Sequence, residues 1–190
     1  MRVAISQRVV FSDKGANRDA LEHDYCEYYS RFNLHLIPIP NVLSNVAEYL
    51  SDLSIDRVIL SGGNDVNPTL YGATLEPESS HSLDRDRTEG EIVKFSIENQ
   101  IPLLAECRGM QFLNVFFGGK LSRVKNHVNL RHKVYFEGNH SREFDLDNNS
   151  VNSYHSFGIT DAECSDKFQV IARADYSDPK CQDSSEPKLR

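Results

Sequence analysis

Short apolar runs alternate with stretches of helical periodicity from residue 1 to residue 119. The apolar runs are typical of buried strands and fall at 3–6, 34–40, 56–63 and 101–107. Between them, apolar residues recur at helical spacing at 17–33, 41–54, 87–100 and 109–119. Apolar strands without polar alternation are typical of a parallel sheet that is covered on both faces. We therefore expect a three-layer α/β domain with a mostly parallel central sheet.

Two of the expected helices have specific features that the structure can test. Asn17 is a plausible N-cap for the first helix. The second helix is expected to place Val42, Val46 and Leu50 on one apolar face. The last of the four helices ends in two glycines, which are typical of a helix C-terminus.

The pattern changes after Gly119. Strand-like segments at 132–139, 143–148 and 167–175 are separated by polar turns, without a long helix between them. This predicts an antiparallel β extension after residue 130. We expect residues 1–176 to form one domain, and residues 177–190, which have almost no apolar residue, to form a disordered tail.

Composition narrows the possible classes of protein. The chain has 190 residues and a net charge of −7, which argues against a nucleic-acid or anionic membrane partner. No apolar stretch approaches the roughly 20 residues of a membrane span or resembles a secretion leader. The four cysteines are scattered without a CxxC pair, which argues against a disulfide or zinc framework. We expect a cytoplasmic protein in a reducing compartment.

Candidate chemistry lies where two of the expected strands end. Cys107 would sit in a sharp turn between a strand and a helix, whose free N–H groups and dipole would lower the thiol pKa. Gly62 and Gly63 follow the neighbouring strand, and with the N–H of Arg108 they could form an oxyanion hole. Gly109 would let the backbone pass closely. The simpler alternative is that Cys107 is a small core residue and the two glycines form an ordinary turn.

Four segments occur in an order that points to a known family. SGGNDVNPTLYG, RDRTE, IPLLAECRGMQFLNVFFGG and VNSYHSFGI resemble the class I glutamine amidotransferase superfamily, within it the γ-glutamyl hydrolase branch. The resemblance covers most of residues 1–175 and implies the flavodoxin-like fold of that superfamily. The segment AECRGMQ further resembles the γ-glutamyl-CDP-amidate hydrolases of bacterial capsule phosphoramidate synthesis.

The resemblance implies a reaction and the residues that carry it. Cys107 would attack the γ-carbonyl of a γ-glutamyl amide and form a thioester, which water then hydrolyses. The backbone N–H groups of Gly63 and Arg108 would hold the oxyanion. The substrate is implied to be a small γ-glutamyl compound, in the narrower resemblance a nucleotide-linked one, and neither a metal nor an organic cofactor is implied. The residues implied to contact the substrate are Gly62, Gln111, Ser153, Tyr154 and His155.

A charged segment is implied to shape the mouth of the site. The segment consists of loop residues Asp65, Arg85, Asp86, Arg87 and Glu89. The alternative for these residues is a solvated charged loop without a role in the site.

The chain departs from the family pattern at its C-terminal end. The family supplies a histidine and a glutamate from a late WHPE-type segment, whereas this chain reads PKCQDSSEPKLR after residue 178. We therefore expect a chain that lacks its proton carrier and has little amidase activity. We expect His155 to line the pocket rather than to carry the proton. Two rival functions stay open: a glutaminase subunit that gives ammonia to a synthetase, and a truncated chain that only binds ligand.

Overall fold

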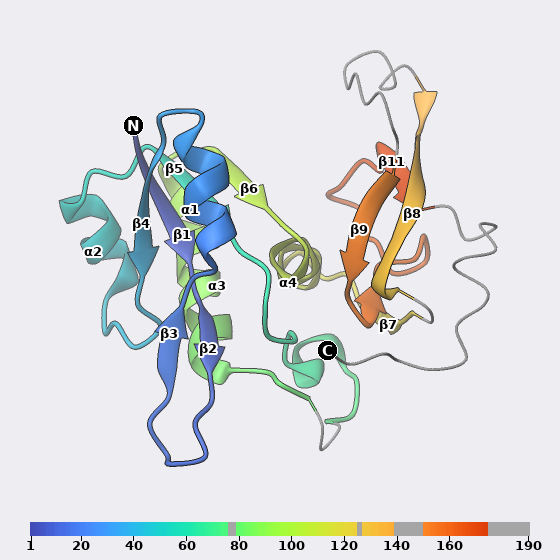
Figure 1. The fold of residues 1–190 in the computed structure, drawn as a ribbon, viewed down its shortest axis with the longest axis horizontal. Coiled ribbons are helices and arrows are strands. Elements are labelled where there is room, and N and C mark those ends of the chain that lie inside the picture. Colours follow the sequence, from blue (N-terminus) through green and yellow to red (C-terminus); the bar gives the residue numbers. More distant parts are fainter. Residues whose placement is uncertain (76–78, 125–126, 139–149, 175–190) are drawn as a thin grey trace. The chain divides into compact units, whose positions relative to one another are not determined.

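The computed structural model describes residues 1–75, 79–124, 127–138 and 150–174 (Figure 1). The chain divides into two compact units, Met1–Gly118 and Gly119–Arg190, and each is described by itself. The division falls at the residue where the hydrophobic pattern changes. The single domain expected over 1–176 stays a prediction. The predicted strand at 143–148 and the predicted tail at 177–190 lie outside the described residues.

A parallel sheet forms the centre of the first unit, as predicted. Its order is β4-β1-β5-β6, and every neighbouring pair is parallel. The chain moves from β1 outward to β4, then returns to β5 on the other side of β1. This reversal is the topological switch point at which open α/β sheets bind ligands. The strands are β1 (Arg2–Ser6), β4 (His35–Ile39), β5 (Arg57–Leu60) and β6 (Leu103–Ala105).

Helices cover both faces of this sheet and complete the three predicted layers. The helix α1 lies on one face, and α2 and α3 lie together on the other (Figure 1). On the α1 face, Val3, Ile5 and Ile59 form a buried cluster with Tyr29. The helical segments are α1 (His23–Ser30), α2 (Val46–Asp52), the short 3₁₀ helix η1 (Pro68–Tyr71), α3 (Leu83–Glu98) and α4 (Arg108–Phe116).

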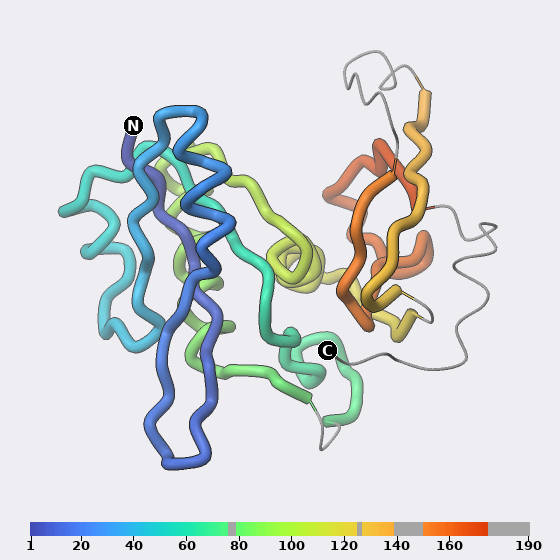
Figure 2. The backbone as a smooth tube through the Cα atoms, in the orientation of Figure 1, coloured from blue at the N-terminus to red at the C-terminus, as the bar shows by residue number. Residues whose placement is uncertain are grey.

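The first predicted helix is shorter than the sequence pattern suggested, and Asn17 does not cap it. Instead, β2 (Arg8–Val10) and β3 (Arg18–Ala20) form an antiparallel hairpin, which extends beyond the end of the sheet (Figure 2). The side chain of Asn64 binds both backbone groups of Val9, at 2.7 and 2.8 Å. These tertiary bonds hold β2 extended, and the pairing of β2 with β3 draws residues 18–20 out of the predicted helix.

The second predicted helix also starts later than expected. The helix α2 begins at Val46, because the Asn45 side chain accepts a hydrogen bond from the Glu48 N–H at 3.1 Å. Such a cap supplies a partner for an N–H group that the first turn leaves unpaired. Val42, predicted for the apolar face, precedes the helix and is 75% exposed.

The second unit is an antiparallel β structure, as predicted for the chain after residue 130. Its strand β8 pairs antiparallel with β9 on one side and β11 on the other. The strand β7, which precedes β8 in the chain, forms a short antiparallel pair with β10, which follows β9. The strands are β7 (Ser122–Arg123), β8 (Val128–Phe136), β9 (Ser150–Tyr154), β10 (Phe157–Gly158) and β11 (Ala172–Ala174).

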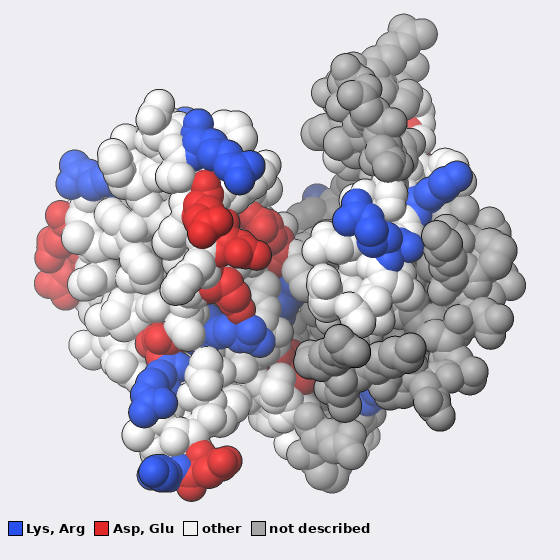
Figure 3. Space-filling model, viewed as in Figure 1, with Lys and Arg blue, Asp and Glu red and all other residues white. Residues whose placement is uncertain are grey.

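Charged side chains of both signs lie on the surface of the first unit. On the face shown in Figure 3, acidic groups gather near the centre of the unit, with basic groups above and below them. None of the helices in the described parts of the chain is both long enough and apolar enough to cross a bilayer.

Gly109 is placed where only glycine fits, and this gives a test of the fold. A Cβ at this position would lie 2.3 Å from the carbonyl oxygen of Leu60, at the end of β5. We predict that Gly109→Ala lowers the free energy of unfolding by about 1–3 kcal/mol, because α4 must move away from β5. Urea unfolding of the full chain measures this change.

Gly90→Ala is the matched control. Gly90 lies inside α3, and the nearest atom to an added Cβ would be 4.0 Å away. Alanine there should raise the free energy of unfolding by about 0.5–1 kcal/mol, because glycine is the poorer helix former. Equal effects of the two substitutions would show that Gly109 is not needed for close packing.

Candidate active site

Cys107 occupies a strained turn at the carboxyl edge of the sheet. It is the N-cap residue of α4, two residues after β6, with φ 50° and ψ −109°. Non-glycine residues rarely adopt positive φ, and such strain clusters at functional sites. Two hydrogen bonds hold the turn: Gly109 N–H to Glu106 O at 2.8 Å, and Gln111 N–H to Cys107 O at 3.2 Å. Cys107 thus lies in a turn between a strand and a helix, as predicted, and its side chain is exposed.

Gly62, the first of the two glycines after β5, lies beside this cysteine. A Cβ on Gly62 would be 3.7 Å from the Cβ of Cys107. The N–H of Gly62 is already bonded to the hydroxyl of Tyr25 at 2.8 Å, so it is not a free donor. Gly63 has φ +123°, and within the described residues its N–H donates to no protein group. Of the two glycine N–H groups, that of Gly63 therefore fits an oxyanion better.

The charged segment predicted to be a loop at the mouth is instead part of a helix. The helix α3 begins at Leu83, four residues before its predicted start, and the Ser82 hydroxyl accepts from the Arg85 N–H at 3.3 Å. Arg85, Asp86 and Glu89 therefore lie in the first turns of α3. The sequence alone suggested a solvated loop because four of five consecutive residues, 85–89, carry charge. Asp65 does lie in a loop, where its carboxylate accepts from the Ser80 N–H at 3.0 Å.

These helical charges form a buried ion cluster with Arg108. Arg85 binds Glu89 at 2.9 Å, and Arg108 binds both Glu89 and Asp86. Arg85 and Glu89 are 0% exposed, Arg108 is 2% exposed and Asp86 is 7% exposed. Two cations thus meet two carboxylates, so the buried charges balance. The cluster joins α3 to the first residue of α4, next to Cys107.

Burial changes the pKa values within the cluster without neutralising its arginines. Burial lowers the pKa of Arg85 to about 10 and that of Arg108 to about 9, so both stay charged at neutral pH. Burial raises the pKa of Asp86, and the Arg108 guanidinium opposes this rise. Arg87, the remaining cation of the segment, is exposed and donates to the Leu43 carbonyl at 3.0 Å.

The pKa of the Cys107 thiol is raised, contrary to the expectation from the sequence. Burial by the surrounding protein raises this pKa, although part of the side chain is exposed. The Arg108 N–H and the Arg85 charge lower it, and the Glu106 charge raises it again. The sequence pattern showed the helix N-terminus but not the burial or the acidic neighbour. A thiol in this state needs a base in order to become a nucleophile.

Sequence reasoning missed the roles of two tyrosines of α1, Tyr25 and Tyr29, at the site. The Tyr25 hydroxyl binds Gly62, and the Tyr29 hydroxyl donates to the Glu106 carboxylate next to Cys107. Burial raises the pKa of both tyrosines, so both hydroxyls keep their protons at neutral pH. The available signal was their spacing of four residues on the apolar face of the predicted helix.

Gln111 lies one helical turn after Cys107 in α4, as predicted. Its side chain is 6% exposed, and its N–H donates to the Cys107 carbonyl. A contact between Gln111 and substrate stays a prediction.

The other predicted substrate contacts belong to the second unit. Ser153, in β9, is buried, and its hydroxyl donates to the His127 carbonyl. Tyr154 is 65% exposed. His155 is half-buried, with Nδ1 2.7 Å from the Phe157 carbonyl oxygen. Because this unit is described by itself, the role of these residues toward Cys107 stays a prediction.

Three histidine rings gather inside the second unit. The ring of His127 lies 4.9 Å from that of His132 and 5.1 Å from that of His155. Burial lowers the pKa of His127 and of His155, so both are neutral at neutral pH. Within the described ranges, no three His, Cys, Asp or Glu side chains are arranged so that they could hold a metal ion.

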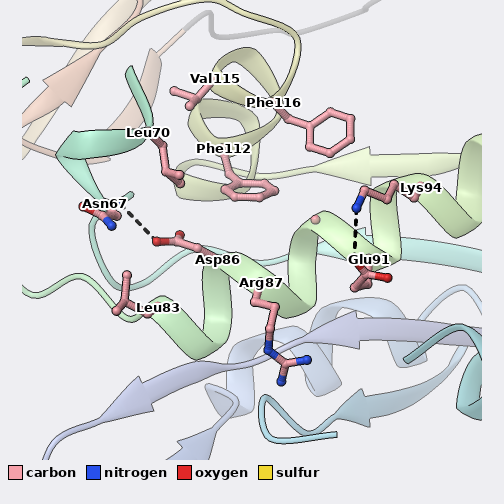
Figure 4. Close-up of a pocket in the computed structure, with 11 residues that line it drawn as sticks. Asn67, Leu70, Leu83, Asp86, Arg87, Glu91, Lys94, Phe112, Val115 and Phe116 are labelled. Atoms are coloured by element: carbon pink, nitrogen blue, oxygen red, sulfur yellow. Dashed lines mark hydrogen bonds and ion pairs between the residues drawn. The ribbon is translucent and has the colours of Figure 1, made fainter. Parts of the chain in front are cut away.

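A separate cavity of about 430 Å³ lies between η1, α3 and α4 (Figure 4). Its lining combines apolar side chains such as Phe112 with the Lys94–Glu91 ion pair. Cys107, Gly62 and Gly63 are absent from this lining, whereas Asp86 belongs both to the cavity and to the ion cluster. The cavity is therefore not the space in front of the nucleophile.

Comparison with known proteins places this arrangement in a family. The family described as Peptidase C26 matches residues 3–178, which is most of the chain. The chain belongs to the Peptidase C26 family. This membership agrees with the class I glutamine amidotransferase-like resemblance of its motifs, and it is consistent with a cysteine-dependent hydrolase.

This Peptidase C26 protein is similar in sequence to two relatives with different names. It is 33% identical over 143 residues to the glutamine amidotransferase-like protein YvdE of Lactococcus lactis, covering 66% of this chain and 58% of that protein. It is 30% identical over 161 residues to the γ-glutamyl-CDP-amidate hydrolase of Campylobacter jejuni, covering 84% of this chain and 72% of that protein. The chain thus spans less than two thirds of the Lactococcus relative.

A solved structure supports the fold of this Peptidase C26 protein. A glutamine amidotransferase from Thermotoga maritima matches with a TM-score of 0.54 at 19% identity, covering 84% of this chain and 62% of that one. At this level of identity the likeness shows the fold. The predicted class I glutamine amidotransferase fold is thereby confirmed.

The raised thiol pKa gives a direct test of the site. We predict that the rate of Cys107 alkylation by iodoacetamide, followed against pH, has its midpoint above that of N-acetylcysteine amide. The reason is that burial and Glu106 outweigh the Arg108 N–H and Arg85. Peptide-resolved mass spectrometry separates Cys107 from Cys26, which serves as an exposed control. A midpoint below that of the model thiol would show that the helix N-terminus dominates after all.

Proposed function

We propose that this protein hydrolyses a γ-glutamyl amide bond, with Cys107 as nucleophile. The observation that carries the proposal is the strained turn, which presents an exposed Cys107 beside the Gly62–Gly63 turn. Membership of the Peptidase C26 family supports a cysteine-dependent hydrolase of this kind. The order of motifs around Cys107 supports the γ-glutamyl branch of that chemistry.

The reaction follows from the groups around Cys107. The Cys107 sulfur attacks the γ-carbonyl carbon, and the carbonyl electrons move to oxygen. The N–H groups of Gly63 and Arg108 stabilise this oxyanion. As the oxyanion collapses, the C–N bond breaks and the amine leaves with a proton. Water then attacks the thioester, which releases glutamate and restores the thiol.

Two proton transfers need a group that the described residues of the first unit do not supply near Cys107. Among its described residues, the charged side chains that act on Cys107 are Arg85 and Glu106, and neither is a histidine. Glu106 raises the thiol pKa, and its carboxylate is bonded to Tyr29. We therefore expect slow turnover unless another group carries these protons. General acid–base help of this kind is worth typically about 10² to 10⁴-fold.

The substrate we propose is γ-glutamyl-CDP-amidate, and simple γ-glutamyl amines come second. Support comes from the segment AECRGMQ and from the Campylobacter relative, whose match covers most of this chain. The proposed partner is thus a small, nucleotide-linked γ-glutamyl compound. The proposed setting is the cytoplasm, with capsule phosphoramidate synthesis as the process.

The second candidate is a glutaminase subunit that gives ammonia to a synthetase. The observation that favours it is the Lactococcus relative, whose name places it with glutamine amidotransferases. Free glutamine would then be the substrate, and a docked synthetase would raise its turnover. Glutamine hydrolysis by the chain alone therefore helps to separate the two candidates.

We predict that the full chain releases glutamate from γ-glutamyl-CDP-amidate faster than from glutamine. Both rates should be low, because no histidine acts on Cys107 among the described residues of the first unit, and Cys107→Ala should abolish them by removing the nucleophile. An enzyme-coupled glutamate assay measures both substrates. Cys26→Ala is the control, because Cys26 lies on the exposed side of α1.

Two results would contradict the proposal. Turnover that survives Cys107→Ala would show that Cys107 is not the nucleophile. A folded chain that hydrolyses glutamine but leaves γ-glutamyl-CDP-amidate intact would favour the glutaminase candidate.

A further inference from the structure

We propose that Arg85 is a positioning residue that aims the Gly63 N–H at the oxyanion. The inference rests on the proposed function, since it assigns a task within the same acyl-transfer site. It goes beyond that proposal by naming a residue that itself touches neither thiol nor substrate.

The first step is the set of contacts made by the Arg85 guanidinium. Its Nη2 donates to the carbonyl oxygens of Ser61 and Gly62, both at 2.8 Å. Its Nη1 lies 3.3 Å from Asn64 Oδ1, and its Nε binds Glu89 at 2.9 Å. The side chain is 0% exposed. Arg85 therefore fixes consecutive carbonyl groups of the turn that follows β5.

The second step is the geometry of the peptide bond between Gly62 and Gly63. In a planar trans peptide the C=O and the following N–H point in opposite directions. The Gly62 carbonyl points at Arg85, so the Gly63 N–H points away from Arg85. Gly62 lies against Cys107, and Gly63 is exposed. This orientation leaves the Gly63 N–H available to a carbonyl oxygen bound in front of the thiol.

The third step is the close fit of Gly63 against the guanidinium. A Cβ on Gly63 would lie 2.7 Å from Arg85 Nη1 and 2.7 Å from Arg8 Cβ. With φ +123°, Gly63 also adopts a backbone conformation that side-chain-bearing residues rarely take. The Arg85 guanidinium therefore packs so closely on the turn that position 63 has no room for a side chain.

The fourth step links the two proposed oxyanion donors. Glu89 Oε1 binds Arg85, which orients the Gly63 N–H, and Glu89 Oε2 binds Arg108, which supplies the other N–H. One buried carboxylate therefore fixes the side chains on which both donors depend. Preorganised donors of this kind stabilise an oxyanion without reorganising during the reaction.

The test compares two reactions of Cys107 in the full chain. In acylation by p-nitrophenyl acetate, an S–C bond forms, the bond between the acetyl carbon and the phenolic oxygen breaks, p-nitrophenolate leaves and the thiol proton goes to buffer. This reaction passes through an oxyanion. Alkylation by iodoacetamide displaces iodide without one, so it reports the thiolate alone. Peptide-resolved mass spectrometry measures both rates at Cys107.

We expect Arg85→Lys to lower the ratio of acylation to alkylation by about 10-fold, since misplacing one oxyanion donor costs part of its 10² to 10³-fold effect. Lysine keeps the positive charge near the thiol but cannot reproduce the guanidinium contacts with Ser61 and Gly62. The alkylation rate itself should change by less than about 2-fold.

Two matched controls separate positioning from other effects. Arg57→Lys makes the same exchange at the opposite end of β5, where Arg57 donates to the Asp56 carbonyl at 2.7 Å. Ile92→Ala destabilises α3 from a fully buried position without touching the turn. Both variants should keep the wild-type ratio.

An unchanged ratio in Arg85→Lys would overturn the inference, whether or not both rates fall together. An equal fall in Ile92→Ala would also overturn it, because the ratio would then follow stability. If Arg85→Lys does not fold, the NMR chemical shift of the Gly63 amide proton in the wild-type protein tests the inference instead. This resonance should move downfield when Cys107 is acetylated, and an unchanged shift would overturn the inference.

The probes contain no glutamyl group, so the test is independent of the substrate. Suppose that the acylation-to-alkylation ratio depends on Arg85 but the protein has no γ-glutamyl hydrolase activity. The proposed substrate would then be wrong, whereas the positioning role of Arg85 would stand.

Discussion

One buried carboxylate holds the candidate site together. Glu89 binds Arg85 with one oxygen and Arg108 with the other, inside a region from which water is excluded. Burying charges costs several kcal/mol per ion unless each ion finds a partner with good geometry. Asp86 supplies the second negative charge and thereby balances the two arginines. The arrangement joins the first turns of α3 to the first residue of α4, and through Arg85 to the end of β5.

This cluster explains how a strained nucleophile turn persists. Cys107 has a positive φ, and Gly109 brings α4 so close to Leu60 that no Cβ fits. Strain of this kind survives only where the surroundings over-determine the backbone. The salt bridges of Arg108 supply part of that determination, directly beside the strained residue. The raised pKa of the thiol then implies that a separate base must generate the thiolate.

The layers and the nucleophile turn could be predicted from the sequence, because apolar runs and glycines mark strand ends locally. The parallel sheet, Cys107 between β6 and α4, and the antiparallel second unit all followed from such patterns. The hairpin at 8–20 could not, because Asn64, distant in the chain, holds Val9 extended. The RDRTE segment was misplaced for the same reason: charges that look solvated in sequence are buried when their partner, Arg108, comes from another helix.

A double-mutant cycle on Glu89→Gln and Arg108→Gln tests the central claim most directly. The free energies of unfolding of the full chain, both single variants and the double variant are measured in urea. If the buried pair organises the site, the coupling energy should be about 2 kcal/mol or more. The same cycle on the exposed Lys94–Glu91 pair should give about 0.5 kcal/mol or less. A Glu89–Arg108 coupling as small as that of the exposed pair would contradict the account.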